Sequence, residues 1–321
     1  MKSTVRAALV AACSLPLLVS LAATAIAQNK MYWTDSDANR VWSANRDGTS
    51  AAPLITLAAG SEPRGIAVDA NNGHIYWTEN GTNRIRRANL VDGADIVDLP
   101  LAGLLFPADI ELDLFNNKLY WADRDAHQIR RSNLDGTNNE LVLDFPGASN
   151  NASPYFISLD VPAGHLYWGN FDAGNIRRAN LDGTAATTVV TGLDRVRDIA
   201  IDPAAAQIYW SDRDTRLIQR QNLDATGRQN LYGPAGLTLP HGIAIDTDAG
   251  FIYWADSDGR TVFRGSLDGS TAMTPLVGAA AGLVNPWDIA LDTVVIPEPA
   301  TGVLVAAFAI AAAVCRIRRR R

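Results

Sequence analysis

A phrase built around Tyr-Trp occurs six times in this chain of 321 residues. In every copy, a branched residue stands eight positions after the tryptophan. The tyrosines are spaced by 44, 44, 47, 42 and 44 residues and are Tyr32, Tyr76, Tyr120, Tyr167, Tyr209 and Tyr253. A period in the forties is typical of repeat architectures, among which helical arrays and β-propellers are the main choices.

The composition of the repeat favours strands. Ile, Leu, Val, Tyr and Trp alternate with polar turns, and an Asp-Gly or related turn closes most copies. Each unit also holds a short outer run and an apolar inner strand, and the inner strands end at Asp69, Asp113, Asp160, Asp202, Asp246 and Asp292. Four strands taken six times predict an all-β, six-bladed propeller over residues 28–293.

The order of the strands indicates how the ring closes. Adjacent Tyr and Trp point to opposite faces of a strand, so each blade is expected to pack between two others. The body begins with the Tyr-Trp strand at 31–34, which has no inner partner, and ends with an inner strand at 288–292. We expect the last strand to complete the first blade and thereby remove free sheet edges.

The first 27 residues predict export. Lys2 and Arg6 precede an apolar run that ends in small residues at Ala27, the pattern of a signal peptide cleaved there by signal peptidase. A lipoprotein signal at Cys13 is the alternative, but the apolar run continues past this residue. The other cysteine, Cys315, lies in the tail, so the exported body has no disulfide and relies on burial.

Charge restricts the partners of the body. Without the seven basic and one acidic residues of the terminal segments, it carries 21 basic and 33 acidic side chains, a net charge of −12. Such a surface repels nucleic acid and anionic membranes. Arginine pairs such as Arg86/Arg87 are interpreted as solvated charge on outer strands.

Residues Tyr32 to Asp35 read YWTD, and the later copies read YWTE, YWAD, YWGN, YWSD and YWAD. Together with the GIAVD-type and IRRANLDGT-type strands, they make residues 29–292 resemble the low-density lipoprotein receptor class B repeat, the YWTD propeller. The resemblance implies that the repeated residues are structural, with the motif Asp or Thr tying neighbouring blades. Glu79 and Asn170 depart from Asp in this motif.

The tail, residues 294–321, has Pro297, Glu298 and Pro299 before an apolar segment at 300–315 and five arginines. It resembles the PEP-CTERM sorting signal of Gram-negative bacteria that make exopolysaccharide. The resemblance implies a transmembrane helix that anchors the chain transiently in the inner membrane, and an exosortase that acts at the Pro-Glu-Pro motif. The product would reside at the cell surface, the outer membrane or the extracellular matrix. A simple C-terminal membrane anchor is the alternative.

Two aligned positions at the start of the inner strands are candidates for function. The first carries Arg64, Ala108, Tyr155, Arg197, His241 and Trp287. Arg and aromatic residues are typical of binding hot spots, so this mouth of the channel is predicted to contact a ligand or partner. The alternative is that Tyr155 and Trp287 plug the channel as packing.

The second position carries Asp109, Asp198 and Asp288 on alternate blades. Carboxylates converging on the axis would need a shared cation such as Ca²⁺, or would be solvated in a wet channel. The Asp-x-Asp pairs of the hairpin turns are interpreted as caps of their own backbone.

These features together predict an exported, non-enzymatic binding or scaffold propeller whose ligand is a surface protein or exopolysaccharide. The alternative is a metal-dependent hydrolase resembling six-bladed gluconolactonases, with Glu62 and Asn285 recruited beside the three aspartates. That set does not match the family residue by residue, and no Ser-His-Asp spacing, phosphate loop or thiol nucleophile stands out in the sequence.

Overall fold

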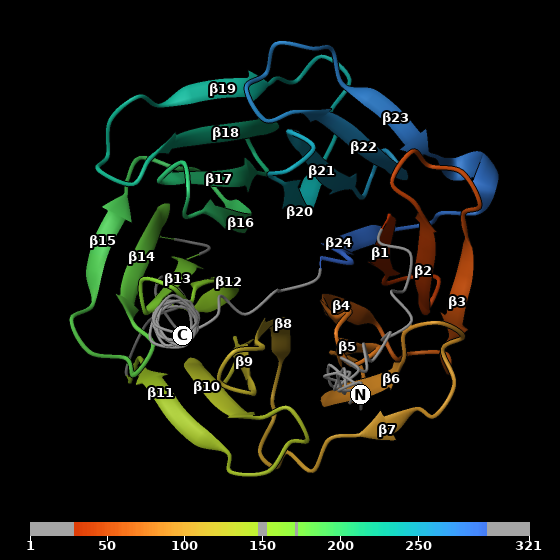
Figure 1. Cartoon of the computed structure of the whole chain (residues 1–321), viewed down its shortest axis with the longest axis vertical. Coiled ribbons are helices and arrows are strands. Elements are labelled where there is room, and N and C mark those ends of the chain that lie inside the picture. Colours follow the sequence, from red (N-terminus) through yellow and green to blue (C-terminus); the bar gives the residue numbers. More distant parts are fainter. Residues whose placement is uncertain (1–28, 147–152, 171–172, 294–321) are drawn as a thin grey trace, which may run out of the picture.

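The structure is a computed structural model that describes residues 29–146, 153–170 and 173–293. These residues form six antiparallel four-stranded sheets arranged as blades around a central axis (Figure 1). The predicted all-β, six-bladed propeller is therefore confirmed. Within the described ranges, no helix is long and apolar enough to cross a membrane. The predicted signal peptide with its cleavage at Ala27 and the sorting tail with Pro297–Pro299 lie outside the described residues.

Each blade runs from an inner strand at the axis to an outer strand at the rim. The first three blades are β24 (Pro286–Leu291), β1 (Lys30–Asp35), β2 (Arg40–Asn45) and β3 (Ala52–Thr56); β4 (Pro63–Asp69), β5 (His74–Glu79), β6 (Arg84–Asn89) and β7 (Val97–Asp98); and β8 (Pro107–Asp113), β9 (Lys118–Asp123), β10 (Gln128–Asn133) and β11 (Glu140–Asp144). The other three are β12 (Pro154–Asp160), β13 (His165–Asn170), β14 (Asn175–Asn180) and β15 (Thr187–Val190); β16 (Val196–Asp202), β17 (Gln207–Asp212), β18 (Leu217–Asn222) and β19 (Gln229–Tyr232); and β20 (Pro240–Asp246), β21 (Phe251–Asp256), β22 (Thr261–Ser266) and β23 (Thr274–Val277). A short 3₁₀ turn, η2 (Ala279–Ala281), precedes β24.

The constant step of eight residues corresponds to one repeated hairpin. In the first blade, Thr34 pairs with Val41, and the equivalent residues pair in all six blades. The last residue of this turn has a positive φ, as at Asn39 (52°) and His127 (54°). Asn and His tolerate this left-handed conformation better than branched residues do, so the turn sequence supports the geometry.

Tyr and Trp of the repeated phrase form the interfaces between blades. Tyr32 of β1 packs in one cluster with Trp77 of β5, and Tyr253 of β21 packs with Trp33 of β1. The other four interfaces pair Tyr76 with Trp121, Tyr120 with Trp168, Tyr167 with Trp210 and Tyr209 with Trp254. All twelve rings are buried. The predicted sandwiching of the blades is therefore confirmed, and burial of each ring contributes about 1.5–3 kcal/mol.

Polar groups of the phrase add specific ties. Asp35 accepts hydrogen bonds from the backbone N–H groups of Val284 and Asn285, both at 2.9 Å, and so anchors the connection that enters its own blade. The Thr34 hydroxyl donates to the Arg64 carbonyl in the next blade. The Thr thus ties neighbouring blades, whereas the Asp holds the loop between them. Like its counterparts, Asp35 also caps its hairpin turn, at Ala38 N–H.

The second arginine of the pairs has a structural role that the sequence interpretation missed. Arg131 Nη1 donates to the Tyr120 hydroxyl at 3.3 Å and to the Leu181 carbonyl of the next blade at 3.2 Å. Arg220 stands at the equivalent position, although it follows Gln219 and so belongs to no pair, and it reaches the Leu267 carbonyl in the same way, at 2.9 Å. The interpretation as solvated edge charge is therefore wrong for Arg131, because its guanidinium group bridges two blades.

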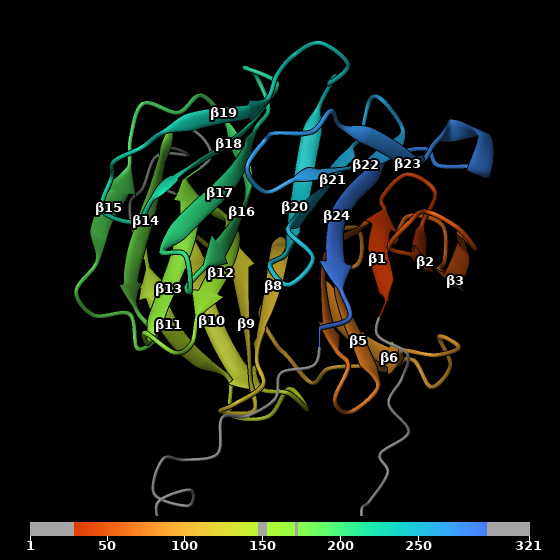
Figure 2. The ribbon, with the colours of Figure 1, turned by 45° about the horizontal axis from the view of Figure 1, so that its top comes forward.

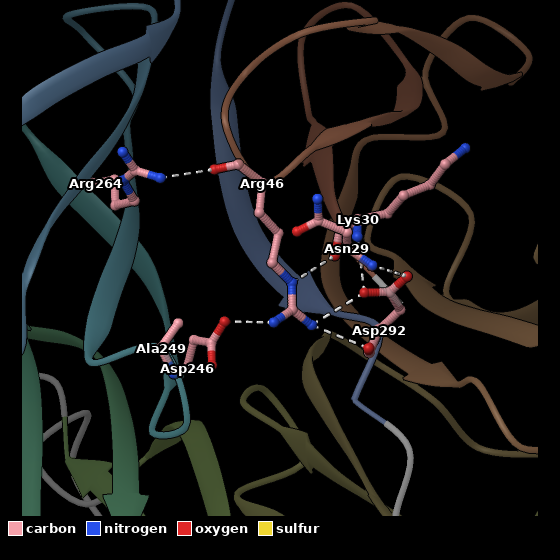
Figure 3. A network of polar contacts seen from close by, with 7 residues as sticks. All are labelled: Asn29, Lys30, Arg46, Asp246, Ala249, Arg264 and Asp292. Atoms are coloured by element: carbon pink, nitrogen blue, oxygen red, sulfur yellow. Dashed lines mark hydrogen bonds and ion pairs between the residues drawn. The ribbon is translucent and has the colours of Figure 1, made fainter. Parts of the chain in front are cut away.

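The last strand closes the ring as predicted. β24 pairs with β1, with Met31 opposite Leu291. Beside this seam Arg46 binds Asp246 of the preceding blade at 2.5 Å and Asp292 at 3.0 Å (Figure 3). The five other repeats have leucine at this place: Leu90, Leu134, Leu181, Leu223 and Leu267. The guanidinium group of Arg46 therefore joins the sixth blade, which contains Asp246, to the end of the strand that closes the ring.

Replacement of Arg46 by leucine, the residue of the other repeats, should cost about 3–5 kcal/mol in the free energy of unfolding. The reason is that Asp246 and Asp292 would be left largely buried without their cation. Denaturant titration measures the loss. Arg228→Leu is the matched control: its site is exposed, its guanidinium lies 5.1 Å from the Trp210 ring centre, and the substitution should change the free energy by no more than about 1 kcal/mol. An equal effect of the two substitutions would show that the seam does not depend on this ion pair.

Candidate functional site

The predicted binding residues converge on one mouth of the channel. Each is the second residue of an inner strand. The ring therefore brings these residues together around the axis: Arg64, Tyr155, Arg197, His241 and Trp287. All but Arg64 are buried, and Ala108 at the equivalent position is buried as well. Their side chains fill this end of the channel, and we call these five residues the mouth cluster.

Guanidinium groups stack on aromatic rings throughout the mouth cluster. Arg64 lies 3.9 Å from the ring centre of Trp287, and Arg197 lies 5.5 Å from that of Tyr155 and 5.7 Å from that of Trp287. The ring centres of His241 and Trp287 are 4.0 Å apart. Cation–π contacts of this kind hold a guanidinium in a defined orientation.

Two further arginines join the mouth cluster from the hairpin turns. Arg124 lies over Phe106 and Tyr155, at 5.0 and 5.8 Å from their ring centres. Arg213 is close enough to lower the pKa values of Arg197 and His241. Both side chains remain about a third exposed. Aligning the inner strands could not identify these two arginines, because they lie outside those strands. The sequence pattern that marks them is a basic residue directly after the motif Asp of the hairpin turn.

His241 is a buried histidine held neutral. Burial lowers its pKa well below the ordinary value, and the nearby Arg197, Arg64 and Arg213 lower it further. Among the described residues, neither ring nitrogen has a hydrogen-bond partner. Burial also lowers the pKa of Arg197 to about 10, so this arginine remains charged at neutral pH. The cluster therefore places a neutral donor and acceptor beneath several positive charges.

Three carboxylates follow the mouth cluster by one position and link neighbouring inner strands by hydrogen bonds: Asp109, Asp198 and Asp288. In each carboxylate, one oxygen accepts the N–H of the following residue and the other accepts an N–H from the next blade. The cross-blade donors are Ile157, Ile243 and Ile66 for Asp109, Asp198 and Asp288, respectively. The sequence predicted their convergence but not this role.

The three aspartates fit a metal ion poorly. Each of the six oxygens already accepts a backbone N–H group, so the carboxylates hold the strands before any cation is considered. Across the described residues, no group of three or more His, Cys, Asp or Glu side chains could hold a metal ion. Burial raises the pKa of Asp288 to about 7, and repulsion from Glu111 adds to this shift. Protonation thus relieves the mutual repulsion in place of a cation.

A cavity of about 280 Å³ follows the axis below the aspartates. Small side chains line one level of it: Ala67, Ser158, Ala200, Ala244 and Ala290. Glu111 occupies the sixth place at this level, and burial, together with the charge of Asp109, raises its pKa to about 8. Glu62 and Asn285, the other proposed hydrolase residues, do not line the cavity.

Comparison with known proteins supports the fold. The family model of the low-density lipoprotein receptor repeat class B matches residues 29–70. A chain in the crystal structure of a nidogen/laminin complex is similar, with a TM-score of 0.71 and 21% identity over 82% of this chain and 97% of that chain. Virginiamycin B lyase from Staphylococcus aureus has a TM-score of 0.54 and 18% identity over 71% of this chain and 74% of its own.

A streptogramin B lyase structure is also similar, with a TM-score of 0.56 and 22% identity over 72% of this chain and 74% of that chain. A search of curated proteins gave no match. At these identities the structural likeness establishes the propeller fold and leaves the activity open.

The buried acids predict a pH-dependent stability. With pKa values of about 8 and 7, Glu111 and Asp288 are largely neutral in the folded ring up to about pH 6, whereas their unfolded forms ionise near pH 4. The unfolded state therefore gains stability as pH rises from about 4 to 8, and the melting temperature should fall across this window. Glu111→Gln removes one titrating group and should flatten the decline. A profile that stays equally steep in this variant would assign the pH dependence to other groups.

Proposed function

We propose that this protein is an exported, non-enzymatic binding propeller of the Gram-negative cell surface or extracellular matrix. Signal peptidase and an exosortase would process its two terminal segments during export. The ligand, an exopolysaccharide or a surface protein, would bind over the mouth cluster. Part of this proposal rests on the resemblance of residues 294–321 to a sorting signal, and part on the mouth itself.

One observation carries the binding proposal. Arg64, Arg124 and Arg213 converge on a single opening of a body whose net charge is −12. Like charges gathered in one place are costly because they repel one another, and such a patch can attract and orient a partner of opposite charge. The frame of the propeller does not need them, because the tyrosine and tryptophan interfaces lie elsewhere.

The location of the chain ends agrees with surface display. The described chain starts beside Asp292, since Asn29 and Lys30 donate their backbone N–H groups to its carboxylate. This is the far end of β24 from Trp287, so the ends and the mouth cluster lie on opposite faces (Figure 2). A tether on either end would leave the mouth free to meet a ligand.

The hydrolase alternative has weaker support. Its proposed metal ligands are the three aspartates, whose oxygens are committed to backbone N–H groups. Glu62 lies instead near Arg64, with 3.7 Å between Oε2 and Nη2. We favour binding because the arginines gather at the mouth, whereas the exposed carboxylates beside them, Glu62, Asp125 and Asp214, form no metal-ligating group among the described residues.

Retention on cells tests the binding proposal. The purified ring, residues 29–293, should sediment with cells that produce exopolysaccharide, and the double variant Arg124→Gln/Arg213→Gln should lose most of this retention. Both positions are partly exposed, so the variant should fold with an unchanged melting temperature. Arg84→Gln, a half-exposed arginine on the outer part of a blade, is the matched control. Retention that survives the double substitution would remove the mouth as the contact face.

A thermal melt tests the hydrolase alternative. Millimolar Ca²⁺ against EDTA should move the melting temperature by no more than about 1 °C, because the aspartate oxygens are already satisfied. A rise of several degrees that Asp109→Asn abolishes would establish a metal in the channel and would overturn this expectation. Lactone and ester substrates would then be the next measurement.

A further inference from the structure

We propose that the mouth cluster, together with Arg124 and Arg213, recognises the carboxylate groups of an acidic glycan. This inference rests on the proposed binding function and narrows the class of ligand. A sugar acid combines an oxyanion with several hydroxyl groups on one ring. The mouth offers a counterpart to each of these two features.

The oxyanion would meet guanidinium groups that are already oriented. Arg64 stacks on Trp287 and also lies 5.6 Å from the ring centre of Phe106. Its Nε–H donates to the side-chain oxygen of Asn80 at 2.6 Å, and the side-chain nitrogen of Asn80 donates to the Pro107 carbonyl at 2.5 Å. An arginine fixed in this way loses little conformational entropy when a carboxylate binds its fork.

The more exposed arginines have room for another anion. Asp125 is the nearest described carboxylate to Arg124, with 3.8 Å between Oδ1 and Nε. Asp214 lies beside Arg213, with 3.9 Å between Oδ1 and Nε. Both distances exceed a charge-assisted hydrogen bond, which is about 2.7–2.9 Å. Both carboxylates are well exposed, so neighbouring charge does not saturate these two guanidinium groups.

The hydroxyl groups of a sugar would suit the polar atoms under the arginines, which are buried in the free ring, so binding would have to shift a guanidinium group aside to reach them. Neither ring nitrogen of His241 has a described partner, and the same holds for Trp287 Nε1 and Arg213 Nε. His241 is 1% exposed and neutral, so it can donate one hydrogen bond and accept another. Buried groups of this kind are costly when unsatisfied, and sugar hydroxyls both donate and accept.

The same surface suits a peptide less well. Arginine clusters also recognise acidic peptides, but peptides usually gain further contacts from a free sheet edge, an apolar groove or a pocket for an anchoring side chain. Here Tyr155 and Trp287 are buried beneath guanidinium groups, so they offer no apolar pocket. Leu105, between β7 and β8, and Val284, before β24, are single exposed apolar residues on two different connections, which is ordinary for a protein surface. We therefore favour a glycan over an acidic peptide.

Calorimetric titration of the ring with three defined hexamers tests the inference: hexagalacturonate, maltohexaose and hexaglutamate. Hexagalacturonate should bind, maltohexaose should not, and hexaglutamate should bind at least about tenfold more weakly. Arg124→Gln and Arg213→Gln should each weaken hexagalacturonate binding about tenfold, the usual loss for one charge-assisted hydrogen bond. Arg84→Gln should leave it unchanged, and raising the salt concentration should weaken it.

Hexaglutamate that binds as tightly as hexagalacturonate would overturn the glycan assignment in favour of an acidic peptide. Absence of hexagalacturonate binding, or binding that both arginine variants retain, would also overturn it. If retention on cells still depends on Arg124 and Arg213 in that case, the binding function stands with another ligand. If hexagalacturonate does not bind and retention on cells does not depend on Arg124 and Arg213, the proposed binding function is overturned as well.

Discussion

The fold depends on one interface that is made six times: a tyrosine of one blade and the tryptophan of the next share a single buried cluster. Within each copy, the tyrosine and the tryptophan are neighbours in sequence and point to opposite faces of their strand. A single strand therefore supplies one ring to each of the two adjacent interfaces. No blade can bury both faces alone. Stability is consequently a property of the closed ring, and the absence of cysteine from the body becomes understandable.

Closure places the channel and its mouth. Because all inner strands run in the same direction, the residues at their starts meet at one end of the axis, whatever their identity. One position further along, the frame uses glycine, a hydrogen-bonding carboxylate or, at Phe156, a buried ring. Gly65 packs on the backbone of Asp109, where a Cβ would lie 2.6 Å from the Asp109 Cα. The start positions themselves are free to vary, and this chain fills them with arginine, histidine and aromatic residues.

The sequence was sufficient for the frame because the frame is periodic. Tyrosine spacing, the constant hairpin step and the missing partner of the first strand together predict the blades and their closure. The interactions that interrupt the period were harder to predict. Arg46, which replaces a repeated leucine, gains meaning only when Asp246 and Asp292 lie on either side of it. Arg124 and Arg213 belong to turns, so their proximity to Tyr155 and His241 depends on the three-dimensional ring.

The seam between the first and last strands also determines how the ring would respond to mechanical load. A force applied to the chain after Thr293 would enter the molecule at Asp292, beside the start of β1. Arg46 holds this residue from the side and passes the load to Asp246 in the neighbouring blade. The first blade and the blade before it would therefore share the tension, and the strand that closes the ring would be protected from peeling away alone.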